Sequence, residues 1–209
     1  MFEYRIIDNF LKEEDFNDLV SIKLKKIKEN EIAVYHNKIF NDGGAQLDCM
    51  DKVFVERLLK NYHETAFGLL KELNQKKASL YEYSEFTMIE TGANYKFGIH
   101  RDSPDKLLSG VIYLAPKINT GTILYENKAG KNKKVIEWKQ NRALFFSRSE
   151  NSTYHSYEGN NLNNRIALVY NLMTTDVKAV CKIEGVNYHK VKFREFLNPY
   201  IYRFFKKIL

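Results

Sequence analysis

Cysteine, proline and glycine are scarce in this chain of 209 residues, and each scarcity excludes a class of protein. The two cysteines, Cys49 and Cys181, are too few and too far apart for a disulfide framework or a zinc knuckle. Three prolines and ten glycines leave no room for a flexible linker, and no internal repeat or low-complexity run is present. We therefore predict one domain spanning residues 1–209, large enough to bury its own core.

Long apolar runs are missing as well. No segment reaches the length of a membrane span, and the N-terminus lacks the charged-then-apolar pattern of a secretory signal. Together with the absence of a disulfide framework, this predicts a cytoplasmic protein with no membrane partner.

Charge of one sign is in excess, and it is unevenly placed. The formal net charge is +7, and residues 128–142 and 190–207 each hold six basic side chains against one acidic one. The simpler interpretation is two solvated faces, and the sharper one is attraction to an acidic partner. No nucleic-acid-binding motif is present, so a nucleic-acid partner is not expected. The sequence leaves the oligomeric state open.

Hydrophobic periodicity predicts helices and short strands in the first third of the chain, followed by many strands. The pattern favours strands at 3–7 and 32–40, helices at 12–28 and 51–73, and a turn at 41–44. From residue 80 to about 183 the apolar period changes to two, which is typical of an antiparallel barrel or sandwich. A short helix is expected from Asn198, with Pro199 in its first turn. Helices followed by strands indicate an α+β fold.

Two histidines and an aspartate form the most informative pattern. Residues two apart in an extended segment project from the same face, so His100 and Asp102 can offer an imidazole and a carboxylate to one point. His155, from another strand, would complete three ligands on one side of a metal. Two histidines and one carboxylate with open positions are typical of non-heme Fe(II) oxygenases.

Arg165 supplies a forked, permanent cation ten residues after His155. Strand alternation from Arg165 places Ala167, Val169 and Asn171 on its face. An inward-facing arginine among small apolar residues is costly without an anion. A bound dicarboxylate would be that anion, and the alternative is an internal acidic partner.

Each of these residues also has an ordinary structural interpretation. His100 and Asp102 could belong to a turn at residues 103–105, and His155 could be a hydrogen-bonded core residue. The four together favour a site, because every one of them would otherwise be a coincidence. The remaining histidines, His36, His63 and His189, have no comparable partners in the sequence and are interpreted as structural.

The stretch from Phe86 to Met173 resembles the 2-oxoglutarate/Fe(II)-dependent dioxygenases, and among them the prolyl 4-hydroxylase-like branch. The motifs that carry the resemblance are Gly98–Asp102, Val111–Leu114, Gly121–Tyr125, Ala143–Ser147, His155 and Arg165–Leu168. Two departures stand out, since Thr120-Gly121 replaces the usual Gly-Gly and residues 139–142 replace a Pro-x-x-Gly. Asn141 tolerates the left-handed backbone that the missing glycine would adopt, so the departure does not argue against the fold.

The resemblance implies a double-stranded β-helix (jelly roll) with N-terminal helices packed on one sheet. It divides the domain into a helical support region (1–79), the β-helix core (80–183) and a C-terminal segment with a short helix (184–209). It also implies that Fe(II) is held by His100, Asp102 and His155, with O₂ as a co-substrate and ascorbate as a possible reductant. Arg165 and Tyr113 would bind the distal carboxylate of 2-oxoglutarate. Asn171, Thr122 and Tyr95 are weaker candidates for the pocket wall.

By the same resemblance, the reaction would hydroxylate an aliphatic C–H with release of succinate and CO₂. A prolyl residue in a peptide or protein is the favoured substrate, followed by a free amino acid or other small molecule, and then by alkylated nucleic acid. Segments 43–44 and 127–134 could form lids over the substrate. A zinc-dependent hydrolase or a non-catalytic cupin-like protein would use the same three ligands. Arg165 discriminates, because neither alternative needs a carboxylate clamp at that position.

Overall fold

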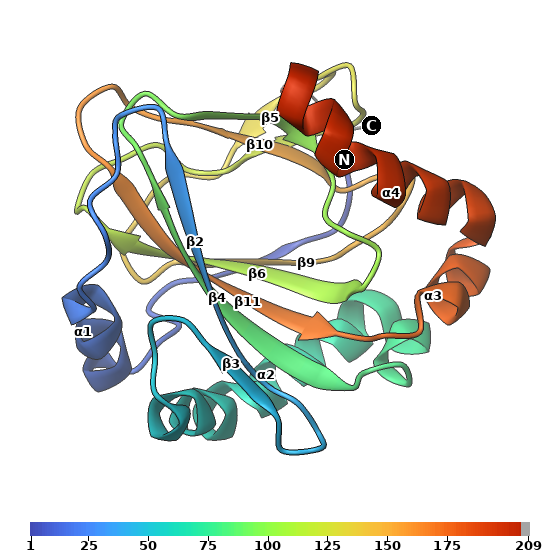
Figure 1. The fold of residues 1–209 in the computed structure, drawn as a ribbon, viewed down its shortest axis with the longest axis horizontal. Helices are drawn as coiled ribbons and strands as arrows, with labels where there is room; N and C mark the ends of the chain where they lie inside the picture. Colours follow the sequence, from blue (N-terminus) through green and yellow to red (C-terminus); the bar gives the residue numbers. More distant parts are fainter. Residues whose placement is uncertain (206–209) are drawn as a thin grey trace.

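A computed structural model describes residues 1–205 of the chain, and their side chains as far as Asn198. The elements follow one another along the sequence as Figure 1 shows. In chain order they are β1 (Arg5–Ile7), α1 (Glu13–Ser21), β2 (Ile32–Ile39), β3 (Ala45–Leu47), α2 (Lys52–Ala78), β4 (Tyr83–Thr91), β5 (Lys96–His100), β6 (Lys106–Ala115), β7 (Ile123–Tyr125), β8 (Lys134–Val135), β9 (Ala143–Ser147), β10 (Tyr154–Glu158), β11 (Arg165–Met173), α3 (Val177–Glu184) and α4 (Tyr188–Phe205).

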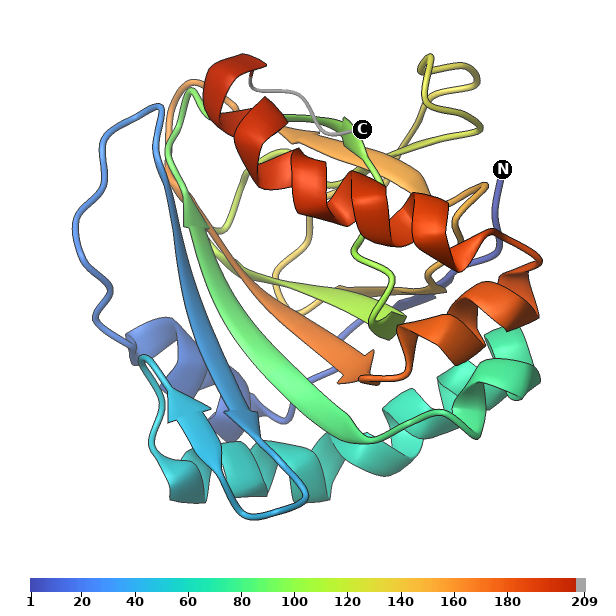
Figure 2. The ribbon, with the colours of Figure 1, turned by 45° about the vertical axis from the view of Figure 1, so that its right-hand side comes forward.

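The strands form two antiparallel sheets that face each other. The larger is seven-stranded in the order β1-β9-β6-β11-β4-β2-β3, and the smaller is four-stranded in the order β5-β10-β7-β8. Helices α1 and α2 lie on the outer face of the larger sheet, and the smaller sheet lies over its inner face (Figure 2). This is the α+β double-stranded β-helix predicted from the sequence, with N-terminal helices packed on one sheet.

Side chains along each strand of the larger sheet alternate between two faces. One face packs against the helices, and the other faces the smaller sheet. On β11, Ile166, Leu168 and Tyr170 belong to the core beneath the helices. Arg165, Ala167 and Val169 line a cavity on the opposite face. The period of two in this segment therefore predicted correctly which side chains face inward. The core beneath the helices is the larger one, and α2 adds Val55, Leu58, Tyr62, Ala66 and Leu70 to it.

The N-terminal helices differ from prediction mainly in length. Helix α1 ends at Ser21 rather than at residue 28. The amide of Lys25 instead donates a hydrogen bond to the Tyr35 hydroxyl, 3.1 Å away. The lysines at 23, 25, 26 and 28 lie close together in sequence, and like charges on one helical face are unfavourable. Tertiary contacts thus keep this segment outside the helix.

Helix α2 begins as predicted at Asp51, whose carboxylate accepts a hydrogen bond from the amide of Phe54 at 2.7 Å. The predicted end at Leu73 coincides with an interruption, because Asn74 has a non-helical backbone (φ −161°, ψ 82°). The helix then resumes to Ala78. The periodicity therefore located the first, straight part of α2.

The C-terminal part of the chain corrects two predictions. The strand region ends at Met173, and α3 follows, capped by the Asp176 carboxylate and closed by Gly185 with φ 67°. The last helix begins at Tyr188 rather than near residue 198, because the Asn187 side chain accepts a hydrogen bond from the amide of Lys190. Pro199 therefore lies inside α4 and does not start it. Residues 206–209 lie outside the described residues.

The turn before β9 behaves as expected for an asparagine in place of a glycine. Asn141 has φ 59°, in the left-handed region. Its side chain also accepts a hydrogen bond from the amide of Leu11 and donates one to the Leu11 carbonyl, both at 2.8 Å. At the other departure, Gly121 permits close packing, since an added Cβ would lie 1.7 Å from the Ile136 carbonyl oxygen. In the part of the chain that the structure describes, no helix is both long and apolar enough to cross a membrane.

Candidate metal centre and co-substrate pocket

A cavity of about 550 Å³ opens between the two sheets and brings most of the predicted site residues together. Among the residues that line it are His100, Asp102, His155, Arg165, Thr122 and Tyr95. Helix α4 contributes Arg194, Glu195 and Asn198 to the same wall. Residues far apart in sequence thus share one cavity.

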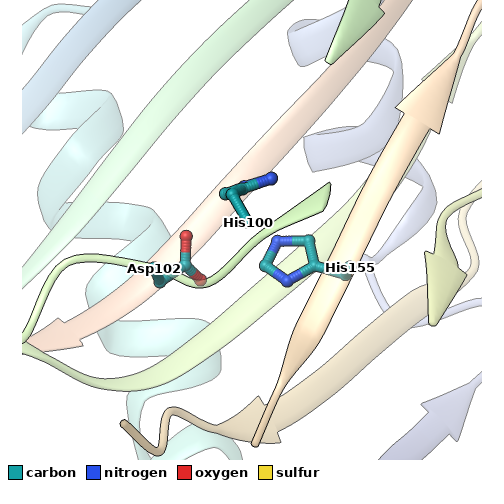
Figure 3. A group of neighbouring side chains, drawn as sticks. All are labelled: His100, Asp102 and His155. Atoms are coloured by element: carbon teal, nitrogen blue, oxygen red, sulfur yellow. The ribbon is translucent and has the colours of Figure 1, made fainter. Parts of the chain in front are cut away.

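His100, Asp102 and His155 form the candidate metal centre. His100 ends β5 and is paired with His155 on β10, and Asp102 follows two residues later. One ligand atom from each side chain lies within 4.8 Å of the others. Figure 3 shows the three side chains converging on one point. Three ligands placed in this way would hold one side of a metal ion, as in a facial triad.

Main-chain hydrogen bonds fix the tautomer of both histidines. The Nδ1 atom of His100 lies 2.9 Å from the Gly98 carbonyl oxygen, and that of His155 lies 2.9 Å from the Thr153 carbonyl oxygen. A carbonyl can only accept, so each Nδ1 carries the proton. The Nε2 lone pair of each ring is then available for a metal.

The charges of the triad also suit a cation. Burial, followed by the charge of the neighbouring His155, lowers the pKa of His100 from 6.5 to about 3. Burial alone would raise the pKa of Asp102, but the charges of Lys106, His155 and His100 and a hydrogen bond from Ser109 together hold it below its ordinary value. A neutral His100 and an ionised Asp102 are the forms that bind a divalent metal.

Arg165 is buried, only 7% exposed, and has no acidic partner among the described residues. Its Nε atom is fully buried and makes no hydrogen bond. The guanidinium instead lies against three aromatic rings, 4.1 Å from the centroid of Tyr157 and 5.4 Å from those of Tyr113 and Trp138. Burial lowers the pKa of Arg165, but a guanidinium remains charged at neutral pH. An internal ion pair, the alternative interpretation, is therefore not found in the part of the chain that the structure describes.

The hydroxyl of Tyr113, which was predicted to bind the co-substrate, is hydrogen-bonded to Thr122. Tyr113 is fully buried and is not part of the cavity wall. Its hydroxyl donates to the Thr122 hydroxyl at 3.0 Å and accepts from the Thr122 amide at 2.8 Å. Thr122 does line the cavity. Direct contact between Tyr113 and a co-substrate remains a prediction, and it would require the tyrosine to leave one of these partners.

Asn171 lies beside the metal centre rather than on the cavity wall. It is buried on β11 opposite Ser109, whose hydroxyl donates to the Asp102 carboxylate at 2.6 Å. The Asn171 Oδ1 atom is buried and makes no hydrogen bond. Its predicted role in the pocket therefore stays a prediction. Tyr95, another weak candidate, is buried and does line the cavity.

Sequence reasoning missed several groups around the site. Tyr157 follows His155 by two residues on β10, and this spacing could have indicated a cavity position. Lys106, 3.1 Å from the Asp102 carboxylate, is four residues from it in sequence. Arg148 donates from Nε to the Asp102 carbonyl at 3.1 Å, and Arg194 comes from α4. Arg148 and Arg194 had no local signal in the sequence, because only the fold brings them to the site.

No protein-family model matches this chain, and no curated protein matches it by sequence. Solved structures do match. An oxidoreductase of the 2OG-Fe(II) oxygenase family from Burkholderia pseudomallei is 14% identical with a TM-score of 0.57, covering 81% of this chain and 84% of its own. A Pseudomonas putida prolyl-4-hydroxylase is 11% identical with a TM-score of 0.57, covering 83% and 94%. IDO from Bacillus thuringiensis is 11% identical with a TM-score of 0.53, covering 83% and 93%.

The chain therefore has the fold of the 2OG-Fe(II) oxygenases, including prolyl 4-hydroxylases. Within that fold, His100, Asp102 and His155 form a triad consistent with a facial iron site. The similarity covers most of the chain but at low sequence identity, so it concerns the fold. What the site does has to be argued from its own residues.

Proposed function

We propose that this protein is an Fe(II)- and 2-oxoglutarate-dependent dioxygenase that hydroxylates an aliphatic C–H bond. The observation that carries the proposal is the buried, unpaired guanidinium of Arg165 in the same cavity as the His100, Asp102 and His155 ligands. A buried cation without a counter-ion is unfavourable, so the cavity is suited to an anion. 2-Oxoglutarate has a carboxylate for the arginine and a keto acid for a metal.

The ligand atoms present fit Fe(II). Two neutral imidazoles and a carboxylate hold one face of the ion, and Ser109 and Lys106 orient the carboxylate through its two oxygens. When bound, iron with 2-oxoglutarate and O₂ would supply the oxidising chemistry that ends in succinate, CO₂ and a hydroxylated product. The protein would bind, orient and exclude water, with aliphatic side chains such as Val111, Ala167 and Val169 forming the dry part of the wall.

Arg165 also argues against the two other classes of function. A metal-dependent hydrolase needs a metal-bound water and space for its substrate, and a cupin-like binding protein needs only the ligands. Neither accounts for a cation held among Tyr157, Tyr113 and Trp138 with no acidic partner in the described part of the chain. A carboxylate-bearing co-substrate does account for it.

For the primary substrate we propose a prolyl residue in a peptide or protein. The support is the likeness of the fold to the Pseudomonas putida prolyl-4-hydroxylase. A second candidate is a small molecule such as a free amino acid. Helix α4 favours it, because Arg194, Glu195 and Asn198 form part of the cavity wall.

The direct test is conversion of 2-oxoglutarate to succinate by the purified protein under air with Fe(II). We expect slow turnover without a primary substrate, faster turnover with the correct one, and none without oxygen or iron. Proline-containing peptides should gain one oxygen atom on proline, as measured by mass spectrometry. Coupled turnover with a free amino acid but with no peptide would move the protein to the small-molecule class. The absence of any succinate under all of these conditions would contradict the proposed chemistry.

A further inference from the structure

Three cations from separate segments gather beside the cavity, and we call them the cationic rim. They are Arg101, between β5 and β6, Lys128, between β7 and β8, and Arg194 on α4. Arg101 and Arg194 line the cavity. Burial, and then the charges of Arg101 and Arg194, lower the pKa of Lys128. Lys128 therefore lies near both arginines. Three like charges thus occupy one region.

The backbone next to Lys128 packs against β5, and this contact helps to place Lys128 near the two arginines. Gly130, two residues further on, has φ 81° and packs against β5, so that an added Cβ would lie 3.0 Å from the Cδ1 atom of Ile99. The connection between β7 and β8 therefore lies over the strand that leads into Arg101. Lys134, at the end of the same connection, instead lies over the Tyr4 ring, with its Nζ 5.2 Å from the centroid.

The acidic side chains that accept hydrogen bonds from the rim, Glu150 and Glu195, are fewer than its three cations. Glu150 is shared, accepting from Arg101 at 2.9 Å and also from Arg148 and Arg194. Glu195 accepts from Arg194 at 2.8 Å. Arg101, Arg148 and Arg194 thus share Glu150, and Arg148 also donates to Glu184 at 3.1 Å.

Arg101 retains unused donors. Its side chain is only 12% exposed, and its terminal nitrogens contact Glu150 and the Tyr154 hydroxyl. Its Nε atom is buried and makes no hydrogen bond. Leaving a buried donor of a charged group unpaired is unfavourable, and an anionic ligand would satisfy it. Arg101 directly follows His100, so such a ligand would lie next to the metal centre.

We propose that the cationic rim binds an anionic oxygen group, a carboxylate or a phosphate, of the primary substrate. Arg101 and Arg194 would hold the group, and the nearby Lys128 would add charge. The substrate is then an acidic compound or peptide whose reacting C–H faces the triad. This inference rests on the proposed function, and it adds the class of substrate.

The test begins with binding, which does not depend on turnover. Lys128 is acylated with a neutral reagent, and the rate of acylation is followed by mass spectrometry. Mn(II) and 2-oxoglutarate are present to fill the inner cavity. The probes are N-acetyl amino acids and their amides, prolyl peptides containing aspartate or asparagine, and prolyl peptides containing phosphoserine or serine. We expect acidic probes to protect Lys128 at concentrations where their uncharged partners do not, with no protection of Lys133.

Variants show whether the rim is responsible. Arg194→Gln should weaken protection by an acidic probe about tenfold, while Arg194→Lys should retain most of it. Lys128→Gln should raise the KM for an acidic substrate, leaving kcat and the KM of its amide unchanged. Lys133→Gln is the matched control, since it removes the same charge from the same connection, and it should change nothing. Because Lys128 has a largely exposed side chain, its replacement tests the rim without disturbing α4.

The outcomes separate the two proposals. Protection of Lys128 by acidic probes without any succinate formation would support the rim and contradict the dioxygenase. Succinate formation with equal protection by acids and amides, or with none, would contradict the rim and leave the dioxygenase standing. If only the carboxylate probes protect Lys128, the anionic group is a carboxylate. If only the phosphoserine peptide protects it, the group is a phosphate.

Discussion

Arg165 has an environment that is difficult to explain without a ligand. Its guanidinium is buried among aromatic rings, and no acidic side chain of the described residues lies within ion-pairing distance. Ring faces stabilise a cation by only about 0.5–2 kcal/mol each, which is less than the cost of removing it from water. The structure thus holds a positive charge in place before any anion has arrived.

We predict that Arg165→Ala weakens 2-oxoglutarate binding far more than metal binding. Truncating one partner of a buried charged contact costs roughly 2–5 kcal/mol, which is tens-fold to thousands-fold in affinity. Anaerobic calorimetric titration of the Fe(II)-loaded protein with 2-oxoglutarate measures the effect. Arg5→Ala, which removes a surface arginine paired with Glu72, serves as the control and should leave both affinities unchanged. Equal 2-oxoglutarate affinity in Arg165→Ala and the wild type would remove the clamp from the proposal.

The triad residues are predicted to bind the metal and not to hold the fold. His100→Ala, Asp102→Ala and His155→Ala should each abolish Fe(II) binding, because three protein ligands are the minimum of a facial site. Equilibrium metal binding and far-UV circular dichroism measure the two properties separately. His63→Ala is a suitable control, since that ring stacks on Phe67 away from the cavity. Succinate formation near the wild-type rate in any triad variant would exclude that residue as a ligand.

The turn before β9 shows how one element is positioned by a single side chain. Asn141 carries the left-handed backbone and two hydrogen bonds to Leu11, tying the N-terminal segment to the strand that follows. That strand, β9, pairs with β6, one of the strands of the cavity face. The turn therefore supports the sheet on which the site is built.

We predict that Asn141→Ala lowers the free energy of unfolding by about 3–4 kcal/mol. Left-handed backbone costs an alanine roughly 1–2 kcal/mol, and each lost hydrogen bond costs about 1 kcal/mol. Asn141→Gly relieves the strain but not the lost bonds, so it should fall between Asn141→Ala and the wild type. Urea unfolding monitored by fluorescence of Trp138 measures all three. An Asn141→Ala variant as stable as the glycine variant would contradict the assigned strain.

Helix α4 has a comparable role on the other side of the cavity. Its Arg194 binds Glu150, which is also bound by Arg101 and Arg148, and Arg148 reaches the Asp102 main chain. A chain of charged contacts thus connects the last helix to the metal-ligand segment. The helix would carry substrate preference and, through Arg148, support the position of Asp102.

The molecule as a whole carries an excess of basic residues and a buried, neutral histidine. The histidine makes the free energy of unfolding depend on pH. The folded metal-free protein lowers the pKa of His100 to about 3, chiefly by burial, from its ordinary value of 6.5. Below pH 6.5 the unfolded chain therefore takes up a proton that folded His100 does not. Stability from this residue is full above pH 6.5 and is lost as the pH falls toward 3. The lowered pKa of Asp102 acts in the same direction at the acid end.

We predict that the free energy of unfolding of the metal-free protein falls between pH 6.5 and pH 4, and that His100→Gln reduces this dependence. Urea unfolding at several pH values with a chelator present measures it. His189→Gln, in a helix away from the triad, is the control and should keep the wild-type pH dependence. The same protonation competes with the metal, so metal affinity should weaken over the same range. Identical pH profiles for His100→Gln and the wild type would show that His100 is not held neutral.

Much of the site could be predicted from the sequence because its signals are local. The spacing of His100 and Asp102, the alternation that turns Arg165 inward, the cap at Asp51 and the tolerant turn at Asn141 each depend on neighbours within a few residues. Local chemistry of this kind survives folding, because the backbone geometry that it requires is set over the same short distance.

Only the tertiary structure decided the rest. The lysines at 23–28, which the sequence pattern places in a helix, lie outside regular secondary structure, and the amide of Lys25 donates to the Tyr35 hydroxyl of β2. The Tyr113 hydroxyl bonds to Thr122, and Arg101, Lys128 and Arg194 lie near one another although they come from three separate segments. These contacts depend on which strands pair and where α4 packs, and both are determined by the burial of the whole core rather than by any short stretch of sequence.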